Sequence, residues 1–136
     1  MAQENLPKTI LIVEDETALA EVLTDTLTDE GYTVTSCING EDGLQEALKT
    51  HPSLILLDIL MPKKDGMILL SELRRDQTPP ISSVIFFTNL NQVDKIADAV
   101  KEGAEGYIIK AEASLEDVVK KVNEFFTRKN SEVKTA

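Results

Sequence analysis

The sequence predicts an α/β fold in which five parallel strands form one sheet with helices on both faces. Short apolar runs alternate five times along the chain with segments whose apolar residues have helical spacing. Strict alternation of strands with helices of about 10–15 residues is typical of a parallel sheet. The length of 136 residues is that of one domain.

The expected strands differ in how deeply they should be buried. Residues 10–13, 54–57 and 84–87 are continuously apolar, which is typical of strands covered on both faces. Residues 32–37 alternate polar and apolar side chains, as edge strands do, and residues 107–109 form a short run. A central trio flanked by the second and fifth strands corresponds to a flavodoxin-like, doubly wound sheet with strand order 2-1-3-4-5.

Helices are expected between these runs and after the last one. The clearest apolar stripe belongs to the last helix and comprises Leu115, Val118, Val119, Val122 and Phe125. Capping pairs are predicted at the starts of the second, fourth and fifth helices, namely Asn39 with Asp42, Asn91 with Asp94, and Ser114 with Asp117. The folded domain is expected to span residues 8–127, with flexible ends over residues 1–7 and 128–136.

Charge is distributed unevenly along the chain. The net charge of −10 resides in residues 1–48, where Lys8 is the single base against 11 acids, because residues 49–136 carry 13 of each sign. This balance argues against direct nucleic-acid binding and against an anionic membrane surface. Apolar runs are too short to span a bilayer, and Cys37 is the one cysteine, so we expect a cytoplasmic protein without disulfides.

Polar residues follow the apolar strands where each one ends. Residues 14–16 (Glu-Asp-Glu) follow the first strand, Asp58 the third, Thr88 the fourth and Lys110 the fifth. In the predicted strand order these side chains converge at the carboxyl edge of the sheet, where ligands bind in open α/β folds. Two carboxylates about 4 Å apart repel by ~4 kcal/mol at an effective dielectric near 20, so a cation or Lys110 must compensate.

The residue types at this edge indicate which ligands suit the pocket. Carboxylates, a backbone carbonyl and water form a hard oxygen site that favours Mg²⁺ over zinc. The Thr88 hydroxyl and the Lys110 ammonium are donors on the other side of Asp58. A cation and two donors around one carboxylate match the needs of an oxyanion-rich group, such as a phosphoryl on Asp58.

Four motifs resemble the receiver domains of two-component response regulators, over about residues 8–127: IVEDE at 12–16, LILLDILMPKKDG at 54–66, FFT at 86–88 and GAEGYIIK at 103–110. The resemblance implies that Asp58 accepts a phosphoryl group from a sensor histidine kinase or phosphotransfer protein. It implies Mg²⁺ ligation by Asp15 and Asp58 directly, by Glu14 through water and by the Leu60 carbonyl. Thr88 and Lys110 would bind the phosphoryl oxygens, and Tyr107 would change rotamer on activation.

The resemblance also implies a signalling output. Phosphorylation would switch a surface made of the fourth helix, the fifth strand and the fifth helix, which signals to a downstream protein target. The chain would have phosphotransfer and autodephosphorylation activity rather than turnover, and would be a monomer that can dimerise when phosphorylated. Asn89 stands where the family favours Ala or Gly, and Ala111 where Pro is usual, so access to the phosphoryl and the following loop are expected to differ.

Other interpretations of the same residues are a phosphohydrolase, a flavin-binding electron carrier, a phosphorylation-independent adaptor and the receiver of a larger regulator. A phosphohydrolase would need an acid two residues after Asp58, where Leu60 stands. Flavin phosphate would be repelled by the acidic residues 14–16. Leu60 and Leu90, the second residues after Asp58 and Thr88, predict poor water access and a long-lived phosphorylated form. The pairs at 63–64 (Lys-Lys) and 74–75 (Arg-Arg) are interpreted as solvated.

Overall fold

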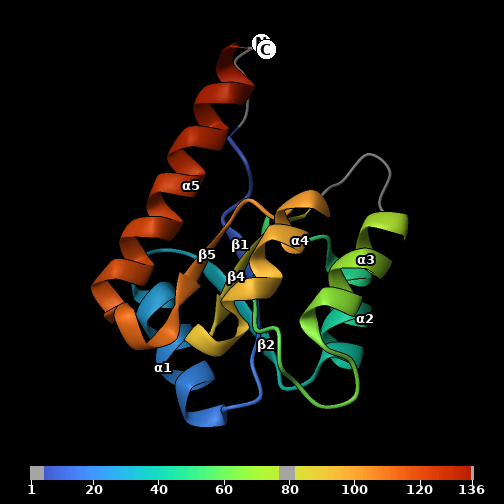
Figure 1. The fold of residues 1–136 in the computed structure, drawn as a ribbon. Helices are drawn as coiled ribbons and strands as arrows, with labels where there is room; N and C mark the ends of the chain where they lie inside the picture. The colour runs from blue at the N-terminus through green and yellow to red at the C-terminus, as the bar shows by residue number, and fades with distance from the viewer. Residues whose placement is uncertain (1–4, 77–81, 136) are drawn as a thin grey trace.

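Five strands and five α-helices alternate along the described part of the chain (Figure 1). The computed structural model describes residues 5–76 and 82–135. Residues 1–4 and 136, where we expected flexible ends, lie outside the described residues. The strands are β1 (Thr9–Val13), β2 (Thr33–Cys37), β3 (Leu54–Leu57), β4 (Ser83–Thr88) and β5 (Gly106–Ile109). The helices are α1 (Thr17–Asp29), α2 (Gly40–Thr50), α3 (Gly66–Asp76), α4 (Ile96–Lys101) and α5 (Leu115–Thr135), with short 3₁₀ helices η1 (Leu90–Lys95) and η2 (Lys110–Glu112).

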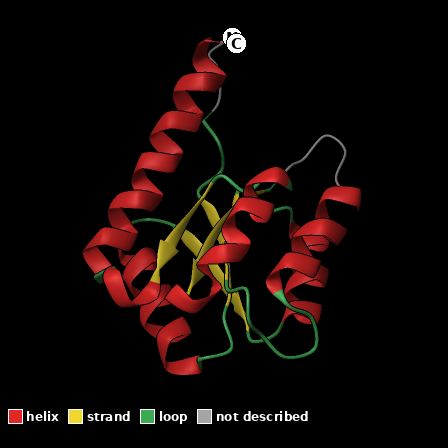
Figure 2. Ribbon diagram, viewed as in Figure 1, coloured by secondary structure: helices red, strands yellow, loops and turns green. Residues whose placement is uncertain are grey.

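The sheet is parallel, with the strand order β2-β1-β3-β4-β5. This is the flavodoxin-like order predicted from the apolar runs, and the three strands expected to be fully covered lie at its centre (Figure 2). Residues 10–13 are aligned with residues 54–57 of β3, so β1 and β3 end at the same level. Side chains that follow these two strands are therefore neighbours.

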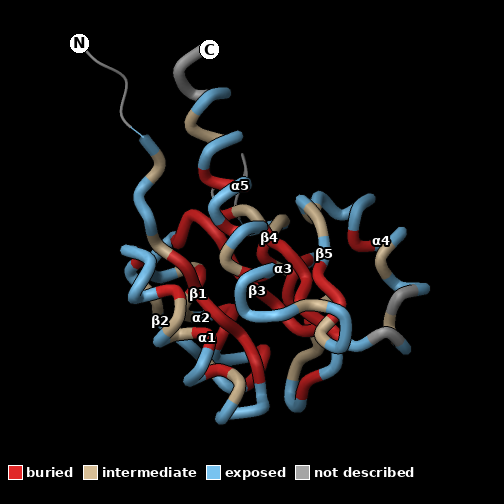
Figure 3. The backbone as a smooth tube through the Cα atoms, turned by 90° about the vertical axis from the view of Figure 1, so that its left-hand side faces the viewer, coloured by how far each residue is buried: buried red, intermediate tan, exposed pale blue. Residues whose placement is uncertain are grey.

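Each face of the sheet has its own core. On one face, alternate residues of the central strands pack with buried side chains of α1 and α5, including Leu23, Leu27 and Val122. On the other face the remaining strand residues pack with α2, α3 and α4, through side chains such as Leu69 and Ala99. In Figure 3 the central strands are buried along their length, whereas β2 is largely exposed or half-buried, as expected of an edge strand.

Helix α5 continues to Thr135, past residue 127, where the polar sequence led us to expect the end of the folded domain. Partners elsewhere in the fold explain the extension. Glu105 forms ion pairs of 3.0 Å with Arg128 and 3.1 Å with Lys129, and the Asn130 side chain accepts a hydrogen bond of 2.8 Å from the Leu6 amide. The boundary at residue 127 therefore does not mark the end of the helix.

Two of the three predicted capping pairs are present. The Asn39 side chain accepts from the Asp42 amide at 2.8 Å, and Ser114 and Asp117 exchange hydrogen bonds at the start of α5. The prediction for Asn91 is wrong, because Asn91 lies inside η1. That 3₁₀ segment starts with a turn in which the Gln92 amide donates to the Asn89 carbonyl at 3.0 Å, so α4 begins later and is short.

Candidate functional site

Asp58 lies at the carboxyl end of β3 and is 3% exposed. Each of its carboxylate oxygens has a donor from a neighbouring element. The Thr88 hydroxyl, at the end of β4, donates to Oδ1 at 2.9 Å, and Lys110 Nζ, which follows β5, donates to Oδ2 at 2.9 Å. The structure thus brings together the three residues that the sequence predicted from three different strand ends.

Lys110 is the cationic centre of this cluster. Its Nζ lies 2.7 Å from Glu14 Oε1, 2.9 Å from Asp58 Oδ2 and 3.4 Å from Glu16 Oε1. Burial disfavours the charged ammonium, but hydrogen bonds and the charges of Glu14 and Asp58 outweigh it and raise the Lys110 pKa above its ordinary value. The lysine therefore stays protonated and holds the acids together.

Glu14 is the most buried acid of the cluster. Its Oε2 accepts from the Glu16 amide at 3.1 Å, and its Oε1 pairs with Lys110. Burial raises the Glu14 pKa, and the contacts with Lys110 and the Glu16 amide only partly oppose that rise. Glu14, Asp15, Glu16 and Asp58 together place four carboxyl groups beside the Lys110 ammonium.

The donor set fits a magnesium ion. Carboxylate oxygens of Glu14, Asp15 and Asp58 lie within 4.8 Å of one another, and Asp15 is the exposed member. A pocket of about 400 Å³ opens beside them, lined by residues that include Asp15, Asp58, Leu60 and Asn89. Hard oxygen donors, excess negative charge and room for water are what Mg²⁺ requires.

The loop between β3 and α3 folds back so that Gly66 packs against the backbone of Asp58 and Ile59. The Gly66 amide donates to the Ile59 carbonyl at 2.7 Å, and a Cβ atom at Gly66 would lie 2.2 Å from the Asp58 carbonyl oxygen. On the other side of the loop, a Cβ atom at Gly40 would lie 1.8 Å from the Lys64 carbonyl oxygen. Glycine at both helix starts lets α2 and α3 enclose the segment that carries Asp58 and Leu60.

Two basic residues that we interpreted as solvated are attached to the fold instead. Lys64 is 15% exposed and pairs with Glu72 of α3 and with Glu41 of α2, the latter at 3.5 Å. Arg74 donates to the Ser82 carbonyl at 2.7 Å, and burial lowers its pKa. The sequence did not reveal these contacts, because the partners of Lys64 and Arg74 come from other elements. The one available signal was that each stands beside a second base, Lys63 or Arg75, so that only one base of each pair needs to face solvent.

Tyr107 and Leu60 lie at the margins of the acidic cluster. The Tyr107 ring is 46% exposed and belongs to a shallow pocket with Asp117 and Lys121, so the structure does not bring it to Asp58. Leu60 is 58% exposed and lines the pocket beside Asp15 and Asp58. Part of the predicted site thus surrounds the Asp58 carboxylate, and Tyr107 lies on the outer surface of β5.

A buried aspartate beside an acidic cluster, at the carboxyl edge of a 2-1-3-4-5 sheet, is the arrangement of a receiver-type fold. The chain belongs to the response regulator receiver domain family, whose model matches residues 10–123. It is therefore a receiver domain of two-component signalling. In the described residues, 5–76 and 82–135, no helix combines the length and the apolar character needed to cross a membrane.

Individual relatives agree with this assignment. The chain is 35% identical over 130 residues to the probable transcriptional regulator ycf27 of Pyropia yezoensis, covering 91% of this chain and 52% of that protein. It is 40% identical over 101 residues to the response regulator ArlR of Staphylococcus aureus, covering 74% and 45%. The chain thus spans about half the length of the curated relatives it matches.

Solved structures resemble the whole fold. The signal receiver domain of a LuxO repressor protein from Vibrio parahaemolyticus superimposes with a TM-score of 0.83 at 28% identity, covering 93% of this chain and 95% of that one. A CheY-like response regulator receiver domain from Methanospirillum hungatei has a TM-score of 0.83 at 26% identity, with 94% and 99% coverage. The family assignment thus agrees with the sheet order observed here.

Proposed function

We propose that this receiver domain is a phosphorylation-dependent switch in which Asp58 is the phosphoacceptor. The observation that carries the proposal is the environment of the Asp58 carboxylate, whose two oxygens are bound by Thr88 and Lys110 beside an acidic cluster suited to Mg²⁺. The phosphodonor is a sensor histidine kinase or a phosphotransfer protein, as family membership implies.

In the transfer step, an Asp58 carboxylate oxygen forms a bond to phosphorus while the bond from phosphorus to the donor imidazole nitrogen breaks. The released imidazole takes a proton from solvent. Before transfer, Lys110 and Thr88 donate hydrogen bonds to the Asp58 carboxylate. After transfer, the same two donors bind the phosphoryl oxygens. Asp15, Asp58 and the Leu60 carbonyl, with Glu14 through a water, would hold Mg²⁺, which would neutralise negative charge during transfer.

The aspartyl phosphate carries about −1.5 to −2 charges in place of the single charge of the Asp58 carboxylate, so transfer makes the site more negative by roughly half a charge to one charge. Thr88 is the last residue of β4 and is followed after Asn89 by η1, so a movement of its hydroxyl toward the phosphoryl displaces the start of that segment. The exposed Tyr107 ring then turns inward into the space that Thr88 leaves. The α4–β5–α5 surface carries the signal to a downstream protein.

Names of the curated relatives point to one kind of output. Since one is a probable transcriptional regulator and another a response regulator, we infer that this receiver serves gene regulation. The acidic balance of the chain disfavours direct contact with DNA phosphates. Regulation would therefore act through a protein partner or through a part of the protein that corresponds to the unmatched half of those relatives.

Acetyl phosphate tests the acceptor without a kinase. In Mg²⁺ buffer, mass spectrometry should record one added phosphoryl on the parent chain, none on Asp58→Asn and none after chelation. Asp65→Asn is the matched control, because it removes an acid of the same loop while an asparagine still caps the Ile68 amide. Normal labelling of Asp58→Asn would exclude Asp58 as the acceptor.

A further inference from the structure

Glu16 stands at the start of α1, but its side chain does not cap that helix. It occupies the N-cap position and makes no side-chain hydrogen bond to the helix amides, and glutamate is not among the residue types that cap helices well. The Glu16 carboxylate is turned to the Asp58 site instead, where its Oε1 accepts a hydrogen bond of 3.4 Å from Lys110 Nζ. By its contacts, the residue that precedes α1 therefore belongs to the environment of Lys110.

The Lys110 ammonium has as many carboxylate partners as it has N–H donors. A lysine ammonium carries three donors. Glu14 Oε1 lies 2.7 Å from Lys110 Nζ, Asp58 Oδ2 lies 2.9 Å from it, and Glu16 Oε1 lies 3.4 Å from it. A phosphoryl group on Asp58 brings further oxygens that need a donor from the same ammonium. One of the three contacts must therefore be given up when Asp58 is phosphorylated.

The three carboxylates differ in how easily they can lose Lys110. Glu14 and Asp58 are buried, whereas the Glu16 side chain is 63% exposed and makes the longest of the three contacts. A buried carboxylate that loses its partner is left with an uncompensated charge, whereas water replaces the partner of an exposed one at little cost. Glu16 is therefore the partner that releases Lys110 when a phosphoryl group is present.

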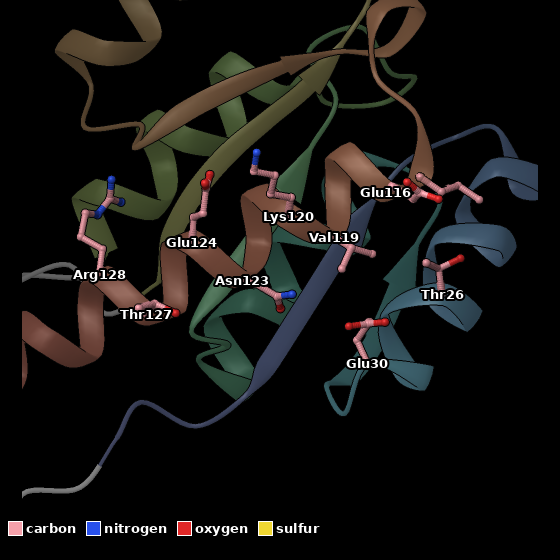
Figure 4. A pocket seen from close by; sticks show the side chains of 10 residues that line it. Thr26, Glu30, Glu116, Val119, Lys120, Asn123, Glu124, Thr127 and Arg128 are labelled. Carbon is pink, nitrogen blue, oxygen red and sulfur yellow. The ribbon is translucent and has the colours of Figure 1, made fainter.

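The Glu16 side chain also has room to move away from Lys110. It lines the pocket beside Asp58 and a second pocket of about 490 Å³, between α1 and the loop that follows β5. A rotation of the side chain into this second pocket can free Lys110 without a movement of the backbone. The larger groove of about 670 Å³ between α1 and α5 is lined by Thr26 and Glu30 of α1 (Figure 4), and by neither Glu16 nor Lys110.

We propose that Glu16 is a positioning residue that holds Lys110 in the unphosphorylated site and competes with the phosphoryl group for it. The inference rests on the proposed role of Asp58 as the phosphoacceptor. Because the contact between Glu16 and Lys110 is made before transfer and lost after it, this ion pair stabilises the unphosphorylated state alone. The strength of one exposed ion pair thus sets part of the balance between the two states of the switch.

Beryllofluoride, an analogue of the phosphoryl group, tests this competition on the whole chain in saturating Mg²⁺, with its Kd taken from an NMR titration. Glu16→Gln keeps the length of the side chain and removes its charge. We expect it to bind beryllofluoride about two- to fivefold more tightly, as the loss of an exposed ion pair allows. Glu16→Asp keeps the charge but is too short for a contact that is already 3.4 Å, and aspartate is drawn to the α1 amides as an N-cap. It should show a similar gain.

Glu30→Gln is the matched control, because it removes the same charge from the other end of α1, about 20 Å along the helix, where Glu30 lines the groove of Figure 4. It should bind beryllofluoride like the parent. Mg²⁺ binding without beryllofluoride separates positioning from a general change of the site. Since Glu16→Gln removes an acid near the cation, its Mg²⁺ affinity should stay equal or fall while its beryllofluoride affinity rises.

Parental beryllofluoride affinity in Glu16→Gln would overturn the proposal, and so would a parallel rise in its Mg²⁺ affinity. A gain in Glu16→Gln without one in Glu16→Asp would also overturn it, because the effect would then be charge repulsion and not the contact with Lys110. If the parent chain itself bound no beryllofluoride, the role of Asp58 as acceptor would fail, and this inference with it.

Discussion

The Thr88 hydroxyl donates a hydrogen bond of 2.9 Å to Asp58 Oδ1, across the neighbouring strands β4 and β3. Both side chains are buried, so this bond is shielded from competing water. The residue that ends β4, immediately before the segment leading to η1, is thereby tied to the acceptor carboxylate. In the proposed switch, a phosphoryl group on Asp58 draws the Thr88 hydroxyl toward its oxygens, and the start of η1 is expected to move with it.

Thr88→Val should separate phosphoryl acceptance from the conformational response. Valine has nearly the shape of threonine but lacks the hydroxyl, so Asp58 keeps Lys110 and the acidic cluster while β4 loses its link to the phosphoryl. We expect labelling by acetyl phosphate to persist and the chemical-shift changes of α4 and β5 in NMR spectra to be lost. Thr88→Ser keeps the hydroxyl and should respond like the parent; a full response of Thr88→Val would contradict this coupling.

Magnesium should stabilise the fold by mass action, by ~2.7 kcal/mol when its concentration is a hundred times Kd. Asp15→Asn should weaken Mg²⁺ binding more than Glu14→Gln does. Both Glu14 oxygens are already engaged, by Lys110 and by the Glu16 amide, whereas Asp15 is the exposed acid of the cluster. Melting temperatures recorded across a Mg²⁺ titration give the two affinities, and equal affinities would refute the ranking.

Lys64→Met should lower Mg²⁺ affinity without touching the ion. Lys64 pairs with Glu72 and Glu41 and so holds the β3–α3 loop, which carries Leu60, against α2 and α3. Loosening that loop reduces the fraction of molecules in which the Leu60 carbonyl is in place, which should appear as a several-fold weaker Mg²⁺ titration. Lys63→Met, at the exposed neighbouring position, is the control and should titrate like the parent.

The sequence was sufficient to predict the sheet and the convergence of Asp58, Thr88 and Lys110. Continuous apolar runs rank strands by burial, and a parallel topology then forces the residues after neighbouring strands to one edge. The register of β1 with β3, which places residues 14–16 beside Asp58, follows from the same pattern. These features depend on residue order and on apolar periodicity, both of which are local properties.

Features that depend on partners distant in sequence could not be predicted in this way. Lys64 and Arg74 look like solvated bases until the fold brings Glu72 and the Ser82 carbonyl to them. The polar segment after residue 127 remains helical because Glu105, in the loop before β5, pairs with its first turn. The missing Asn91 cap has a different, local cause, because a turn in which the Gln92 amide donates to the Asn89 carbonyl starts a 3₁₀ helix that includes Asn91.

The lifetime of the phosphorylated form should depend on Leu60. Hydrolysis requires a water in line with phosphorus, opposite the Asp58 oxygen, and the exposed Leu60 side chain lines the pocket beside Asp58, from which we expect that water to approach. An alkyl group there offers water no hydrogen bond, and Asn89 also lines the entrance. The Leu90 side chain, which the sequence also placed on this path, lies outside the described part of the structure, so Leu60 alone is the test position.

Leu60→Asn should speed autodephosphorylation by up to about tenfold, which requires only ~1.4 kcal/mol off the barrier. The asparagine amide can accept from and donate to the attacking water, so that a larger share of the entering waters is held in line with phosphorus. Leu60→Ala is the matched variant, because it removes the bulk without adding a polar group; a gain in both variants identifies crowding, and a gain in Leu60→Asn alone identifies orientation of the water. The measurement is the loss of label from purified phosphoprotein in excess Mg²⁺, and decay at the parental rate in both variants would show that water entry past Leu60 does not limit hydrolysis.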